Sequence, residues 1–155
     1  MDYKSILERI EQEIKPYLQE GKVASYIPAL AEANREDFAL SLTLLDGSNY
    51  CVGVSEKRFS IQSISKVFLY SMALGIFGDE ILKRVGVEPS GNPFNSLVQL
   101  EYESGIPRNP FINPGAIVIA DMLVSHFGES AKDEVLRYIR NIAKDDSICI
   151  DDDIA

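Results

Sequence analysis

Residues 60–77 read SIQSISKVFLYSMALGIF, a segment in which apolar residues predominate. Apolar side chains point almost all round a helix built from this stretch, as is typical of a helix buried at the centre of a domain. Lys66 is the only charged residue between Arg58 and Asp79. A buried ammonium group is costly unless it is paired or gives up its proton. The stretch therefore predicts a long buried helix that holds one lysine with unusual chemistry.

Three polar side chains share one face of this predicted helix. At roughly 100° of rotation per residue, Ser63, Lys66 and Tyr70 fall within about 60° of one another. If Ser60 is the N-cap, Ser63 lies in the first turn. Free backbone N–H groups and the positive end of the helix dipole could there stabilise an oxyanion.

A serine hydroxyl becomes a nucleophile only when a base lies within hydrogen-bond reach, and a desolvated lysine with a lowered pKa can be that base. Ser63 and Lys66 are therefore the candidate nucleophile and base. The Ser-x-x-Lys pattern alone occurs by chance in many proteins, but its place on an apolar helix after a hairpin matches the serine β-lactamases and transpeptidases. His126 is the only histidine. It lies near the end of an amphipathic helix, where a solvated or dipole-facing role is expected in place of a Ser-His-Asp triad.

The flanking sequence predicts one hairpin and several helices. A helix over 3–20 precedes strands at 38–45 and 50–54, which an Asp46-Gly47 turn connects. A short helical turn is expected near Pro28. Further helices are predicted at 60–77, 79–85, 96–103, 114–127 and 129–143, with loops at 88–95 and 105–113. Two strands make a poor sheet on their own, so the pattern favours a sheet with more strands than this sequence supplies.

Composition narrows the class of protein. The 155 residues fit one domain, and the net charge of -9 argues against nucleic acid or an anionic membrane as a partner. The longest apolar stretch, 67–77, is shorter than the roughly 20 residues that span a bilayer, and the N-terminus lacks a signal-peptide core, so a cytoplasmic protein is expected. Cys51 and Cys149 have no metal-ligand or redox spacing and are expected to be reduced and partly buried.

Several strings of the chain, in their order and spacing, resemble the glutaminase family, the serine-dependent L-glutamine amidohydrolases. These strings are YIPAL at 26–30, FSIQSISKV at 59–67, EPSG at 88–91, PFNS at 93–96 and PRNPFIN at 107–113. The resemblance implies an α/β, truncated serine β-lactamase/transpeptidase-like fold with an N-terminal helix, a β-hairpin, a buried Ser-x-x-Lys helix and a helical region. It also implies hydrolysis of L-glutamine to L-glutamate and ammonia through an acyl-enzyme, no cofactor, and a homo-oligomer, commonly a dimer or tetramer.

The resemblance also assigns roles to single residues. It implies that Ser63 attacks the side-chain amide while Lys66 takes its proton, and that the backbone N–H of Ser63 is one oxyanion donor. Tyr26 and Asn113 match positions that line the substrate pocket. Each has a plain structural alternative, since Tyr26 could be a packing aromatic and Asn113 an N-cap ahead of a first-turn proline. The family usually has alanine where this chain has Pro114.

Family members continue well beyond the region matched here, with further substrate-binding residues and a Lys-Ser-Gly strand. Residues 1–155 are therefore expected to be a single partial glutaminase domain that exposes apolar surface and has little activity by itself. The alternative is a truncated, catalytically incomplete fragment, or an interaction module of a glutaminase assembly. A β-lactamase or a penicillin-binding transpeptidase would need an export signal and Ser-Asp-Asn and Lys-Thr-Gly elements, which the sequence lacks.

Overall fold

The structure, a computed structural model, describes residues 1–93 and 104–154. It contains two compact units, one formed by Met1–Ser60 with Asp151–Ala155 and the other by Ile61–Ile150. We call them unit 1 and unit 2. The helix predicted at 96–103 and most of the PFNS string lie outside the described residues.

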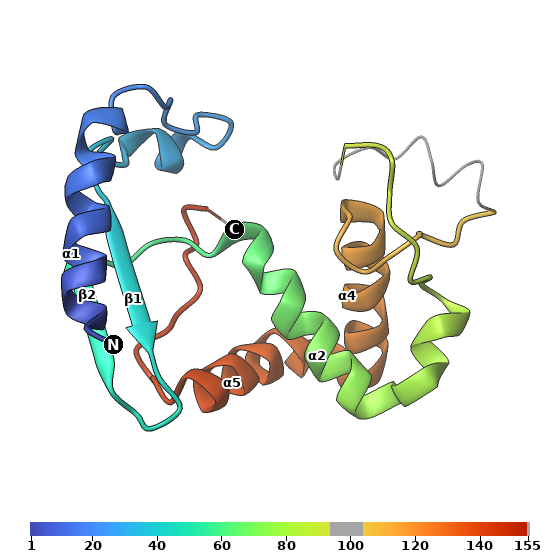
Figure 1. The fold of residues 1–155 in the computed structure, drawn as a ribbon. Helices are drawn as coiled ribbons and strands as arrows, with labels where there is room; N and C mark the ends of the chain where they lie inside the picture. The colour runs from blue at the N-terminus through green and yellow to red at the C-terminus, as the bar shows by residue number, and fades with distance from the viewer. Residues whose placement is uncertain (94–103, 155) are drawn as a thin grey trace. The chain divides into compact units, whose positions relative to one another are not determined.

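Unit 1 is built from helix α1 (Tyr3–Ile14) and the antiparallel strands β1 (Ala39–Thr43) and β2 (Asn49–Gly53), with α1 lying along the hairpin (Figure 1). The strands pair Leu40 with Val52 and Leu42 with Tyr50, and these four side chains are the more buried ones. Alternate residues point away and are exposed, as expected for a sheet covered on one face. The predicted hairpin and its apolar face are confirmed.

The hairpin turn is formed as the sequence predicts. Asp46 Oδ1 accepts a hydrogen bond from the backbone N–H of Ser48 at 2.9 Å. Gly47 has φ 86°, in the left-handed region where glycine carries no Cβ penalty. A 3-10 turn at Pro28–Glu32 confirms the helical turn expected near Pro28.

The first helix is shorter than the predicted range of 3–20. It ends at Ile14, and a 3-10 turn at Lys15–Tyr17 follows. Pro16 explains the change, because proline has no N–H to continue the α-helical hydrogen bonds. At the other end, Asp2 Oδ1 caps α1 by accepting from the backbone N–H of Ser5 at 3.1 Å.

Unit 2 contains the helices α2 (Ser65–Phe77), α4 (Asn113–Phe127) and α5 (Ala131–Ala143), with α2 in contact with both others (Figure 1). Its 3-10 turns span Gln62–Ile64, Gly78–Lys83 and Gly128–Ser130. One apolar cluster joins α2, α4 and the segment after α2. Its buried members are Met72, Ala73, Ile81, Val85, Ile119, Met122 and Leu123. The helices predicted at 114–127 and 129–143 are confirmed within two residues, whereas the one predicted at 79–85 is a 3-10 turn.

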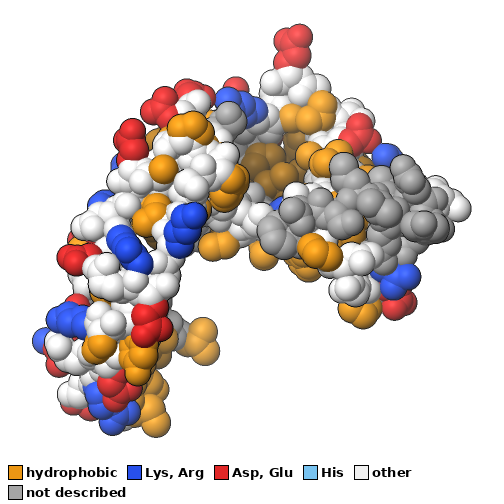
Figure 2. All heavy atoms as spheres, turned by 90° about the horizontal axis from the view of Figure 1, so that it is seen from above, with side chains coloured by type: hydrophobic (Ala, Val, Ile, Leu, Met, Phe, Trp, Pro, Cys, Tyr) orange, Lys and Arg blue, Asp and Glu red, His pale blue; other side chains and the backbone are white. Residues whose placement is uncertain are grey.

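The prediction of a long helix buried on every side is wrong. The α-helix begins at Ser65, five residues later than expected, and only Met72 and Ala73 are fully buried on it. Val67 keeps 52% and Leu74 46% of its surface exposed, because the elements that pack on α2 cover only one side. Hydrophobic side chains reach the surface on the face drawn in Figure 2. The expected exposure of apolar surface is therefore confirmed.

Both cysteines agree with the expected reduced state but not with the expected burial. Cys51 and Cys149 are free thiols and both are exposed, not partly buried. Cys51 lies in β2 on the face that α1 leaves uncovered, where its Sγ lies 3.4 Å from Ser41 Oγ. No helix among residues 1–93 and 104–154 is long and apolar enough to cross a membrane.

Gly115 and Gly75 provide a matched pair of glycine substitutions. A Cβ on Gly115 would lie 1.9 Å from the carbonyl oxygen of Asn109, whereas a Cβ on Gly75 would meet nothing within 4 Å. We expect Gly115→Ala to lower the free energy of unfolding by about 1–3 kcal/mol through overpacking. Gly75→Ala should raise it by about 0.5–1 kcal/mol, since alanine favours a helix interior. Urea denaturation measures both, and an equal effect of the two substitutions would contradict the close packing at Gly115.

Candidate active site

Ser63 lies in the 3-10 turn that directly precedes α2. This turn spans Gln62–Ile64, and its end is closed by the backbone N–H of Ser65, which donates to the carbonyl oxygens of Gln62 and Ser63. Ser63 is exposed, and no side chain caps the N-terminus of α2. The condition that Ser60 is the N-cap is therefore not met, because the cap residue is Ile64. Ser63 precedes the positive end of α2 instead of lying in its first turn.

Gln62 has φ 45°, in the left-handed region that side-chain-bearing residues rarely adopt. Such a conformation costs about 1–2 kcal/mol and persists only where the surroundings impose it. Strained residues of this kind cluster at functional sites. Gln62 lies directly before the exposed Ser63.

Lys66 is half-buried in the first turn of α2. Its Nζ donates to Asn113 Oδ1 at 2.6 Å and to the carbonyl oxygen of Phe111 at 3.3 Å. Burial lowers the pKa of the Lys66 amine below its ordinary value, because desolvation disfavours the ammonium form. The structure thus shows a lysine whose amine donates to Asn113 Oδ1 and to the Phe111 carbonyl oxygen, and whose pKa is lowered by burial.

The two acceptors of Lys66 come from a turn built by Asn109. Its Oδ1 accepts from the backbone N–H groups of Phe111 at 3.0 Å and Ile112 at 3.2 Å. Its Nδ2 donates to the carbonyl oxygen of Glu88 at 2.9 Å. This side chain fixes the turn from inside and ties it to a second segment of unit 2.

Asn113 is not the N-cap of α4. The cap residue is Ile112, and Asn113 is the first helical residue, with Pro114 in the first turn. Its side-chain oxygen binds Lys66. Proline has no N–H to be capped, and the side chain of Asn113 binds the half-buried amine in place of the capping role that was the alternative.

Two other residues singled out by the sequence have packing roles. The Tyr70 ring lies edge-on to the ring of Phe111, with the centroids 5.7 Å apart. The His126 ring contacts Phe77 and Phe127 at centroid distances of 5.5 and 4.6 Å in the exposed last turn of α4. That position agrees with the expected solvated, dipole-facing histidine.

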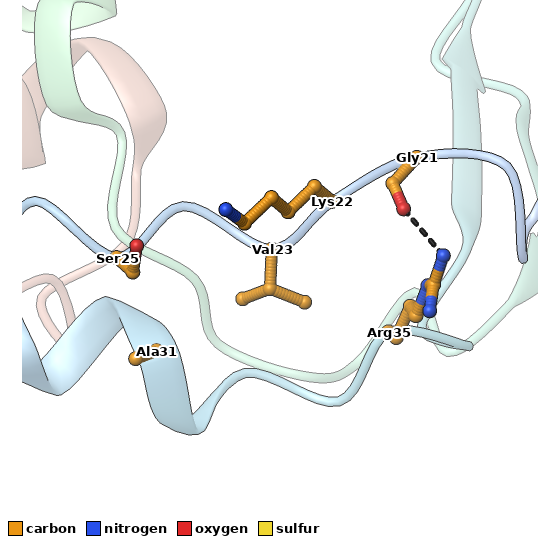
Figure 3. A pocket seen from close by; sticks show the side chains of 6 residues that line it. All are labelled: Gly21, Lys22, Val23, Ser25, Ala31 and Arg35. Atoms are coloured by element: carbon orange, nitrogen blue, oxygen red, sulfur yellow. Dashed lines mark hydrogen bonds between the residues drawn. The ribbon is translucent and has the colours of Figure 1, made fainter.

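Tyr26 belongs to unit 1, where its side chain is 73% exposed, so it is not a buried packing residue there. The neighbouring pocket in Figure 3 is lined by Gly21, Lys22, Val23, Ser25, Ala31 and Arg35. Arg35 Nη2 donates to the carbonyl oxygens of Gln19 and Gly21. The Arg35 guanidinium therefore holds the segment 19–21 against its own loop. None of the four candidate site residues lines this pocket. Among the described residues no cluster of His, Cys, Asp and Glu could hold a metal ion.

The sequence model of the glutaminase family matches residues 21–155. Curated proteins named Glutaminase from Aliarcobacter butzleri and Rhizobium etli are 54% and 52% identical to this chain over 154 and 155 residues. Each match covers 99% of this chain and 50% of the relative. The chain belongs to the glutaminase family. It spans about half the length of the curated relatives it matches.

Solved glutaminase structures share its fold. One named Probable glutaminase ybaS matches 94% of this chain and 49% of its own chain, at 29% identity and a TM-score of 0.80. A probable glutaminase of Bacillus subtilis matches 92% of this chain and 42% of its own, at 30% identity and a TM-score of 0.74. The fold is the serine β-lactamase-like fold of these glutaminases, of which this chain holds the hairpin and the helical region.

Sequence reasoning missed several features of the site. It did not find the carbonyl oxygen of Phe111, the turn-building role of Asn109 or the strained backbone of Gln62. The Asn109-Pro110 pair is a turn signal that could have indicated the turn-building role of Asn109. A main-chain acceptor and a positive φ at glutamine leave no mark in the sequence.

The strain at Gln62 can be measured with two substitutions at the same position. Gln62→Gly relieves the left-handed backbone, whereas Gln62→Ala removes the same side-chain contacts and retains the strain. We expect the glycine variant to be the more stable one by about 1 kcal/mol in urea denaturation. At an ordinary helical position alanine is favoured over glycine by about 1 kcal/mol. An alanine variant more stable than the glycine variant would therefore contradict a strained turn at this position.

Proposed function

We propose that this chain carries the nucleophile and base of a glutaminase, which hydrolyses L-glutamine to L-glutamate and ammonia. The observation that carries the proposal is the Lys66 amine, half-buried and bound to Asn113 Oδ1, three residues after an exposed serine at the N-terminus of α2. A neutral amine beside a hydroxyl is what a serine needs to become a nucleophile.

The proposed reaction has two halves. Ser63 Oγ attacks the side-chain amide carbon of glutamine while its proton passes to Lys66 Nζ. The oxyanion receives a hydrogen bond from the backbone N–H of Ser63. The C–N bond then breaks, Lys66 returns the proton to the leaving nitrogen, and ammonia departs from an acyl-enzyme. Water, deprotonated by Lys66, cleaves the ester, which releases glutamate and restores Ser63.

Tyr26 and Asn113 are proposed to line the substrate pocket. The names of related structures support an amino-acid substrate. A probable glutaminase of Bacillus subtilis, 32% identical over 86% of this chain, is described as complexed with 6-diazo-5-oxo-L-norleucine. A protein named Mglu, 34% identical over 88% of this chain, is described in its glutamate form. Pro114 is compatible with this role, because proline is favoured in the first turn of a helix.

A second candidate function is a catalytically incomplete fragment, or an interaction module of a glutaminase assembly. Exposed apolar residues favour it. Ile64 and Val67, next to the proposed nucleophile and base, are 56% and 52% exposed. Exposed apolar residues mark an interaction site where they form one contiguous patch. The proposal further takes the chain to be a single partial glutaminase domain, cytoplasmic, and part of a homo-oligomer.

Covalent labelling tests the role of Ser63. Treatment with 6-diazo-5-oxo-L-norleucine should modify the chain at Ser63, as read by peptide mapping in a mass spectrometer, and glutamine should compete with the label. Ser63→Ala should abolish labelling, and Lys66→Met should slow it by about 10²–10⁴-fold, the usual contribution of a general base. Ser65→Ala is the matched control and should label normally. A label on any other residue would refute Ser63 as the nucleophile.

Ammonia release separates the two candidate functions. The chain by itself is expected to turn over glutamine far more slowly than a typical enzyme, because the proposed domain is partial. A rate within the common range of about 1–10³ per second would show instead that these residues suffice. The Ser63→Ala variant sets the background.

A further inference from the structure

We propose that the turn from Asn109 to Asn113 is an orienting device for the Lys66 amine, with Asn109 as the positioning residue that builds it. This inference rests on the proposed function, in which Lys66 is the base. It gives Asn113 a task beyond the substrate pocket and gives Asn109 a role in the reaction without contact with the substrate.

The valence of a neutral amine explains why two acceptors matter. Such an amine has two hydrogens and one lone pair, and the lone pair must face the hydroxyl whose proton it takes. Asn113 Oδ1 and the carbonyl oxygen of Phe111 accept from Lys66 Nζ at 2.6 and 3.3 Å. Hydrogens donated in these two directions restrict the directions in which the lone pair can face. Because the lysine side chain has a flexible four-carbon stem, its amine keeps one orientation only when its hydrogen-bond partners are themselves fixed.

The turn supplies fixed partners because it is held at three places. Asn109 Oδ1 binds the backbone N–H groups of Phe111 and Ile112, while Asn109 Nδ2 binds the carbonyl oxygen of Glu88. The backbone N–H of Glu88 donates to the carbonyl oxygen of Arg108 at 2.8 Å. Helix α4 packs directly on the turn, since Gly115 has no Cβ and lies against the carbonyl oxygen of Asn109.

The side chain of Asn113 is neutral, which matters for the pKa of its partner. A carboxylate at the same position would stabilise the ammonium form and hold the proton on Lys66. An amide oxygen orients the amine without adding a negative charge. Asparagine therefore combines orientation with a lowered pKa, which aspartate cannot do.

Other charged groups around α2 do not account for the Lys66 pKa, whose lowering comes from burial. On the turn before α4, the charged residue is Arg108. Helix α4 carries Asp121, which pairs with Arg84 at 3.0 Å, and the exposed His126. The segment after α2 contributes Lys83, paired with Glu80 at 2.5 Å. Two titratable but uncharged groups also lie there. Helix α5 carries Tyr138, whose hydroxyl lies 2.9 Å from Ser71 Oγ, and α2 itself carries Tyr70.

Titration of Lys66 by NMR tests the contact directly. The Cε resonance of Lys66, assigned through Lys66→Arg, should titrate below the ordinary lysine midpoint in the unmodified chain. Asn113→Asp should raise this midpoint by about 1–3 pH units, because the new carboxylate favours the ammonium form. Asn113→Leu should lower it, because an acceptor is lost. Asn141→Asp places the same charge on the exposed surface of α5 and should move the midpoint little. A midpoint equal in all these chains would overturn the inference.

The role of Asn109 is tested with p-nitrophenyl acetate, an ester that carries no amino-acid head group. Ser63 Oγ attacks the acetyl carbon, p-nitrophenolate leaves, and the serine proton passes to Lys66. At a pH where Lys66 is neutral, Asn109→Ala should acetylate Ser63 about 10²-fold more slowly, a loss typical of a misplaced catalytic group. Asn109→Asp keeps an oxygen acceptor for the turn and should recover most of the rate. The core variant Ile139→Val, destabilised at a site away from the turn, should react normally.

The results separate this inference from the proposed function. Acetylation that depends on Lys66 but ignores both asparagines would overturn the orienting turn and leave the nucleophile and base in place. Acetylation of Ser63 that is independent of Lys66 would overturn the proposed function, and with it any catalytic purpose of the turn. An Asn109→Asp variant as slow as Asn109→Ala would reject Asn109 as the residue that presents Phe111 and Asn113 to the amine.

Discussion

A single amine on an apolar helix is the constraint on which the rest of unit 2 depends. Lys66 is the only charge among residues 59–78, and burial lowers the pKa of its amine. The chain surrounds this amine with oxygen acceptors, Asn113 Oδ1 and the carbonyl oxygen of Phe111. Neither is an acid, so the amine is held without being forced to keep its proton. A base that must lose and regain a proton needs this kind of surrounding.

The acceptors in turn constrain the packing of two helices. They belong to the turn before α4 and to its first residue, so the start of α4 must lie within reach of the Lys66 side chain at the start of α2. Gly115 allows the first turn of α4 to press on Asn109, and the buried residues Ile119 and Leu123 follow on the same helix. The apolar cluster therefore stabilises the arrangement that holds the amine. The stability of unit 2 and the proposed chemistry of Lys66 therefore depend on the same two helices, α2 and α4.

The sequence predicted the order of elements well because periodicity and turn residues are local. It predicted the hairpin at 38–54, the helices that became α4 and α5, and the contrast between Lys66 and its apolar helix. It missed what depends on distant partners. An all-round apolar pattern cannot say which neighbours are present, so the burial of Val67 was overestimated. A local rule offered capping as an alternative role for Asn113, whereas its side chain binds a lysine 47 residues away. The start of α2 was misplaced because a positive φ at Gln62 has no sequence signal.

The candidate residues are distributed unevenly between the two units. Ser63, Lys66, Asn109 and Asn113 all lie in Ile61–Ile150, whereas Tyr26 lies in unit 1. The activation of Ser63 that we propose therefore draws on contacts within one compact unit, which has its own apolar cluster and its own turn. A substitution at Tyr26 removes no atom of the lysine–asparagine contact, because both partners of that contact belong to unit 2.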